Sequence, residues 1–309
     1  MRSVRALQDR GGFTTTLAEV RNRADLIVCV GGLPSGPRAD FFRRCGLGET
    51  TVAQRHVVVL GGSANDEAAL AALAGRGVTT ESVPMQGGDL FSTAALLAAL
   101  LADREVGAAP PQLATLAERL RNARYSVFVA ETSRLPTHAG LLIETVDRIV
   151  ATLNIATRSA ALWLGGGNGA DTVNQVFTWL SGLPLRSRAG PAGLEHEPLC
   201  FDAQRLLDDA AVDSLLWVSS FDPGCVPPPT DMPMVVLGHP GLAAATGRPR
   251  TVFIPVSTPG IGSAGHLFRG DGGAVLPLVS LYRDSLPELA DVLTSLTQAV
   301  KALRAEASA

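Results

Sequence analysis

Short apolar runs closed by glycine, proline or serine recur along this chain, and they set the expected fold. Leu26–Val30 runs into Gly31-Gly32, and His56–Leu60 runs into Gly61-Gly62. A third strand is expected over Glu81–Pro84, which ends in proline. Four or five consecutive apolar residues bounded by such breakers are typical of strands buried on both faces of a parallel sheet. We therefore expect three parallel strands here, joined by short helices.

The same order of strands and breakers returns in the second half of the chain. The runs are Ser214–Val218, Met234–Leu237 and Thr251–Ile254, closed in turn by a serine- and proline-containing turn, by glycines and by a proline. This similarity predicts an internal repeat of about 60 residues, with two copies of one open-sheet unit. The alternative is chance, because every α/β chain alternates strands and helices.

Amphipathic helices are expected between the two copies and at the end of the chain. Residues 114–123 and 141–153 show helical spacing, and strands over 125–130 and 161–164 accompany them. The capping pattern Ser285-Leu-Pro-Glu288 opens a C-terminal helix. Its apolar stripe serves either as core or as a docking face, and it consists of Leu289, Val292, Leu293, Leu296, Val300 and Leu303.

The predicted fold is α/β with two related Rossmann-like open parallel-sheet lobes. The first lobe is expected over residues 1–135, where it can share elements with the second, and the second over residues 136–309 with the C-terminal helix. A length of 309 residues fits two domains.

The amino-acid composition excludes several classes of function. Charged residues make up 18% and the net charge is -3, which argues against a nucleic-acid partner and suggests a surface partly covered by other subunits. The longest apolar stretch, near Ala94–Ala102, is too short to span a membrane, and no signal peptide follows Arg2 and Arg5. Four scattered cysteines indicate neither an iron–sulfur nor a zinc site and fit the cytoplasm.

Candidate chemistry is sparse, and each motif has two interpretations. The glycine-rich loop Gly165–Gly169 either binds a phosphate or makes a tight turn. Glu195-His196-Glu197 is either a metal site or a solvated loop. His239 and His266 each follow a glycine, where they either contact a ligand or cap a turn. No acid/base pair can be assembled from the carboxylates, so we expect no catalytic and no metal-binding residues in this chain.

Several segments resemble the B subunit of formylmethanofuran dehydrogenase. The first is Thr14–Asp25, followed by a strand and Gly-Gly-Leu-Pro. Others are Gly167-Asn-Gly169 leading to 174–179 and Gly182-Leu-Pro184, Leu216–Phe221, and Gly265–Asp271. The resemblance runs from about Arg5 to Leu278. The pattern is most similar to the B subunits of bacterial formyltransferase/hydrolase complexes.

The resemblance implies a molybdopterin-oxidoreductase-type core without the iron–sulfur domain. In that fold two nucleotide-fold lobes hold a pterin guanine dinucleotide, and catalytic members carry cysteines upstream of the first lobe. No cysteine precedes Cys29 here, so no cofactor is expected in this chain. A vestigial pocket is then expected at strand-end positions, namely Gly31, Gly32, Gly167, Asn168, Ser219 and His239.

The function that the resemblance implies is a non-catalytic structural subunit of a formyltransferase/hydrolase complex in tetrahydromethanopterin-linked oxidation of formaldehyde to formate. The expected partners are amidohydrolase-like, formyltransferase and third accessory subunits, with zinc and a methanofuran-type carrier on those partners. One alternative is a catalytic formylmethanofuran dehydrogenase chain that uses a tungsten- or molybdenum-pterin, with part of the chain missing. A second is a stand-alone nucleotide-binding module that uses the strand-end glycines.

Overall fold

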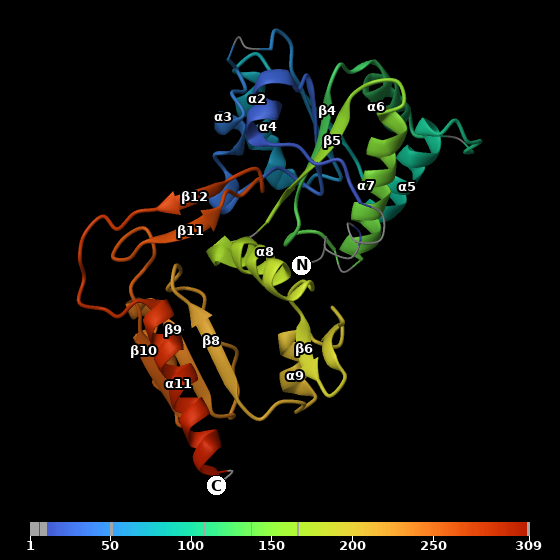
Figure 1. Cartoon of the computed structure of the whole chain (residues 1–309). Helices are drawn as coiled ribbons and strands as arrows, with labels where there is room; N and C mark the ends of the chain where they lie inside the picture. The colour runs from blue at the N-terminus through green and yellow to red at the C-terminus, as the bar shows by residue number, and fades with distance from the viewer. Residues whose placement is uncertain are drawn as a thin grey trace. The chain divides into compact units, whose positions relative to one another are not determined.

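The computed structural model describes residues 6, 11–49, 52–107, 109–136, 138–165 and 167–307. The chain divides into two compact units (Figure 1). Unit 1 comprises residues 1–165 together with 270–273, and unit 2 comprises residues 166–269 and 274–309.

Unit 1 is built on a five-stranded parallel sheet with the strand order β3-β2-β1-β4-β5. Its strands are β1 (Leu26–Val30), β2 (His56–Leu60), β3 (Thr79–Val83), β4 (Ser126–Glu131) and β5 (Ser159–Leu164). Order reverses between β1 and β4, which is the arrangement of a doubly wound nucleotide-binding fold. In such folds the crevice at the carboxyl ends of the strands receives the ligand.

Helices cover both faces of this sheet, because alternate residues of its strands enter two separate cores. Val28 and Phe128 face one core, while Ile27 and Val127 face the other. The first core is completed by α5 (Leu90–Leu101), α6 (Pro111–Asn122) and α7 (Ala139–Leu153). The second is completed by α2 (Leu17–Arg23), α3 (Phe41–Arg44) and α4 (Glu67–Ala74). Short 3-10 turns η1 (Gly36–Arg38) and η2 (Ala64–Asp66) lie in the loops after β1 and β2.

Unit 2 holds a three-stranded parallel sheet of order β10-β9-β8 and two antiparallel hairpins. The sheet consists of β8 (Leu215–Ser219), β9 (Met234–Gly238) and β10 (Thr251–Pro255). The hairpins are β6 (Ser187–Gly190) with β7 (Gly193–His196), and β11 (Gly265–Phe268) with β12 (Val275–Leu278). The other elements are η3 (Gly167–Gly169), α8 (Ala170–Ser181), α9 (Ala203–Asp208), η4 (Pro240–Leu242), α10 (Ala243–Thr246) and α11 (Leu289–Ala307).

The structure confirms the predicted α/β class and the two separate parallel sheets. Strands β1, β2 and β3 are neighbours in sequential order, and so are β8, β9 and β10, as the internal repeat requires. Unit 1 continues past residue 135 to Gly165, because β5 completes the first sheet and α7 packs on one of its faces.

The C-terminal helix forms, but its apolar stripe is not core, because no residue of α11 is buried. Among the described residues, no helix is long and apolar enough to cross a membrane. The segment around Arg2 and Arg5, where the sequence predicts no signal peptide, lies outside the described residues.

Candidate functional site

The predicted strand-end glycines of unit 1 lie where β1 turns away from the sheet. Gly31 has φ +80° and Gly32 φ +125°, backbone conformations that side-chain-bearing residues rarely adopt. A Cβ on Gly31 would lie 3.1 Å from Leu90 Cδ2. The glycines therefore permit a sharp turn at the switch point of the sheet, with a leucine packed closely against it.

Beside this turn, an aspartate satisfies the backbone donors of two loops. Asp66 is buried, and its Oδ1 accepts the N–H of Leu33 at 2.8 Å. Its Oδ2 accepts the N–H of Ser63 at 2.8 Å and the Ser63 hydroxyl at 3.2 Å. The loops after β1 and β2 are thus joined through one carboxylate.

A second carboxylate acts in the same way on the far side of the β1 loop. Glu131, the last residue of β4, accepts the N–H of Ser35 at 2.6 Å through Oε1. Arg134 donates from Nη1 to the carbonyl oxygen of Leu33 and to Ser35 Oγ, both at 2.8 Å. Arg134 Nη1 also lies 3.7 Å from Glu131 Oε1.

The resemblance implies that a fold of this kind holds an anionic pterin guanine dinucleotide, and the hydrogen bonds around the β1 turn show whether unit 1 has donors for its diphosphate. Backbone N–H groups at such loops are the usual ligands of a phosphate. Here the N–H groups of Leu33, Ser35 and Ser63 already donate to Asp66 and Glu131. A diphosphate that used these three N–H groups would have to displace two carboxylates of its own sign, with Arg134 as the one cation in this network. The residues present therefore do not fit that group.

In unit 2, the structure brings three predicted residues together at the carboxyl ends of β8 and β9. Asn168 has φ 55° and donates from Nδ2 to Ser219 Oγ at 2.9 Å. The N–H of His239 donates to the carbonyl oxygen of Ser219 at 2.8 Å. Gly167 precedes Asn168 in η3 and is exposed, while Gly166 of the same glycine run lies outside the described residues. Gly31 and Gly32 belong to the sheet of unit 1.

These polar groups mostly satisfy one another. Ser219 Oγ donates to the carbonyl oxygen of Asp222 at 3.2 Å, so the hydroxyl proton is engaged. Nδ1 of His239 accepts the N–H of Gly241 at 3.0 Å, which makes His239 a turn cap, the second of its two interpretations. Asn168 Oδ1 is buried without a hydrogen-bond partner. Among the described residues, the Ser219 hydroxyl donates to a backbone carbonyl and no hydrogen bond joins it to the imidazole of His239, so these two side chains form no nucleophile–base pair.

The other sequence candidates have structural roles. Glu195-His196-Glu197 begins in strand β7 rather than in a loop, and Glu195 pairs with Arg188 at 2.7 Å. His196 Nδ1 lies 3.1 Å from the carbonyl oxygen of Arg186. His266 is likewise part of a strand, β11. In the part of the chain that the structure describes, no group of three His, Cys, Asp or Glu side chains could hold a metal ion.

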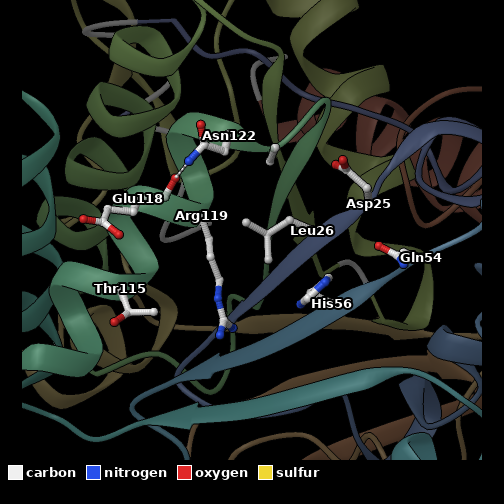
Figure 2. Close-up of a pocket in the computed structure, with 9 residues that line it drawn as sticks. Asp25, Leu26, Gln54, His56, Thr115, Glu118, Arg119 and Asn122 are labelled. Atoms are coloured by element: carbon white, nitrogen blue, oxygen red, sulfur yellow. Dashed lines mark hydrogen bonds between the residues drawn. The ribbon is translucent and has the colours of Figure 1, made fainter.

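Sequence reasoning missed several hollows at the opposite, amino edge of the first sheet. One of them lies between α6 and the beginnings of β1 and β2 (Figure 2). Its volume is about 380 Å³. Arg119 in its wall pairs with Glu81, and Asn122 donates from Nδ2 to the carbonyl oxygen of Glu118 at 2.9 Å. His56 Nδ1 is buried without a partner. The sequence does not reveal this hollow, because the polar residues before β1 and β2 are isolated in sequence and only the strand order of the sheet places them side by side.

Comparison with known proteins finds similarity to B subunits of two kinds of enzyme complex. No family model matches the chain. It is 28% identical over 274 residues to the B subunit of the formyltransferase/hydrolase complex Fhc of Methylorubrum extorquens, covering 87% of this chain and 71% of that protein. It is 26% identical over 286 residues to the B subunit of the tungsten-containing formylmethanofuran dehydrogenase 2 of Methanocaldococcus jannaschii, covering 87% of this chain and 64% of that protein.

A solved structure agrees with the sequence relatives. The chain matches the crystal structure of the formyltransferase/hydrolase complex FhcABCD from Methylorubrum extorquens, determined with methylofuran, with a TM-score of 0.76 and 25% identity. The match covers 95% of this chain and 79% of that chain. The two-unit fold described above is therefore shared with a chain of that complex.

Proposed function

With the resemblance to the B subunits of formylmethanofuran dehydrogenases and of formyltransferase/hydrolase complexes confirmed, we propose that this chain is a non-catalytic structural subunit of a formyltransferase/hydrolase complex. The complex would serve tetrahydromethanopterin-linked oxidation of formaldehyde to formate. The observation that carries the proposal is the match to a chain of the FhcABCD structure over 95% of this chain.

The strand-end networks support a role without catalysis. In unit 1, Asp66 and Glu131 take the backbone donors that a phosphate would need. In unit 2, Ser219 and His239 are committed to backbone groups. The same geometry disfavours a stand-alone nucleotide-binding module, because a nucleotide would meet carboxylates at the β1 turn.

The surface of unit 2 supports a role in assembly. Along α8, Val173, Val176 and Leu180 recur at helical spacing, and Leu180 is 84% exposed. On the three-stranded sheet, the register sets Leu216 and Val252 on either side of Val235, and both are more than half exposed. Parallel sheets occur almost only with both faces covered, so this surface is suited to contact with a partner protein.

The identities of the partners belong to the proposal as well. We propose amidohydrolase-like, formyltransferase and third accessory subunits, with zinc and the methanofuran-type carrier bound by those partners and no cofactor bound here. A cytoplasmic location is proposed on the same basis, and the four free thiols of the chain fit a reducing compartment.

A catalytic dehydrogenase chain is the second candidate, because one relative belongs to a tungsten-containing enzyme. Metal and pterin analysis of the complex, purified through a tag on this chain, separates the two functions. The structural role predicts iron, tungsten, molybdenum and pterin all far below one equivalent per chain. Near-stoichiometric tungsten or molybdenum with pterin would favour the dehydrogenase.

A further inference from the structure

Another hollow at the amino edge of unit 1 is lined by arginines. It measures about 790 Å³, within the size range of small-molecule sites. Its lining residues are Asn22, Arg23, Asp25, Val52, Ala53, Arg124, Tyr125 and Arg158. It lies at the edge opposite the strand-end turn of Gly31, since its residues precede β1, β4 and β5 or end α2.

The sheet register brings the arginines together from three distant segments. Ser126 pairs with Leu26 on one side and with Ser159 on the other. The N–H of Ser126 donates to the carbonyl oxygen of Arg158 at 2.9 Å, and that of Asp25 to the carbonyl oxygen of Tyr125 at 3.2 Å. Residues just before β4 and β5 are therefore fixed side by side, next to the end of α2.

The charges in this hollow do not cancel. Asp25 is the one carboxylate in the wall, and its two oxygens accept the N–H groups of Arg124 and Tyr125, each at 2.9 Å. Among the described residues, neither Arg124 nor Arg158 has an acidic partner within 4.0 Å. Arg23 has one at 3.6 Å, Glu19.

We propose that this arginine hollow, defined by Arg23, Arg124 and Arg158, binds a small ligand with at least two oxyanion groups, phosphate or carboxylate. Planar guanidinium groups recognise both oxyanions through paired N–H donors. A concave site of one sign also raises the local concentration of the opposite charge. Because the side chains are exposed, binding weakens as salt is raised. The site is distinct from the strand-end positions and independent of the proposed assembly role.

Isothermal titration calorimetry of the full chain in its assembled complex tests this site. The probes are pyrophosphate, which has two phosphate groups, and citrate, which has three carboxylate groups, with acetate and its single carboxylate group as the reference. We expect saturable binding of pyrophosphate, citrate or both, and binding of acetate at least tenfold weaker. Tighter binding of pyrophosphate would identify a phosphate ligand, and tighter binding of citrate a carboxylate ligand.

Variants assign the binding to the hollow. The double variant Arg124→Gln/Arg158→Gln should weaken binding at least tenfold, whereas Arg104→Gln, a change at an exposed arginine outside the hollow, should leave it unchanged. Ala53→Glu keeps all three arginines and adds a negative charge to the wall, so it should also weaken binding. The proposal is wrong if neither anion binds, if the double variant binds as tightly as the wild type, or if an acidic peptide binds while both small anions fail.

Discussion

Asp147 carries an energetic cost that can be measured. It lies on α7 with 6% of its surface exposed, and neither carboxylate oxygen has a hydrogen-bond partner. Burial, with a smaller contribution from Glu144, raises the pKa of Asp147 from 3.8 to about 6. The native state therefore holds this proton more tightly than the unfolded state does, so stability falls as pH rises from about 4 to 6. Above pH 6 the buried charge of Asp147 lowers the free energy of unfolding by its full amount, roughly 3 kcal/mol at most.

Asp147→Asn removes the charge and keeps the shape of the side chain. The buried amide stays unsatisfied, as the protonated carboxyl of Asp147 is at pH 4, so we expect no change in stability at pH 4 and a gain of up to about 3 kcal/mol at pH 7.5. Urea unfolding of the full chain at low concentration, followed at both pH values, measures the difference. Asp103→Asn is the matched control, since its ion pair with Arg121 is exposed and should change stability by less than about 1 kcal/mol. A variant no more stable than wild type at pH 7.5, or with an unchanged pH dependence, would refute the reasoning.

Three further predictions follow from the described contacts. Burial raises the pKa of the Cys45 thiol to about 12 and raises the pKa of the Cys29 thiol as well. An alkylating reagent at pH 8 should therefore modify exposed Cys200 and leave Cys29 and Cys45 unmodified until urea is added. Mass spectrometry of the labelled peptides measures this difference. Asp66→Ala leaves backbone N–H groups unpaired and should lower unfolding free energy by about 1–3 kcal/mol, whereas a stability unchanged in urea would contradict the network. Leu216→Ser removes an exposed apolar side chain, so it should improve the solubility of the isolated chain in centrifugation assays and weaken retention of the chain in the complex. If solubility and retention both equal those of the wild type, Leu216 is not part of an interface.

The strands were predictable because their signal is local. Leu26–Val30 and Met234–Gly238 are continuous apolar runs closed by glycine, which suffices to identify buried parallel strands. The unit boundary was not predictable, because β4 and β5 join the sheet at the free edge of β1 rather than next to β3. Strand order depends on contacts between distant residues, and a single sequence does not record them.

The candidate site shows the same limit. Glycines at strand ends identified the turn of β1, but the two carboxylates that satisfy it were not identified. Asp66 follows β2 by several residues, and Glu131 closes β4, so neither forms a local motif. Arg124 and Arg158 likewise meet only through the pairing of β4 with β5. Isolated polar residues become a site only when the fold places them.

Deleting the gene for this chain in its own host, and then fractionating the extract by size, tests the structural role most directly. We expect that formyltransferase and hydrolase activities no longer elute together and that both fall, while the wild-type chain restores co-elution. A His239→Gln chain should restore it within a few-fold, since His239 only caps a turn. If His239→Gln silences a complex that still assembles, the site in unit 2 is catalytic after all. If both activities still elute together at full level without this chain, the structural role is contradicted.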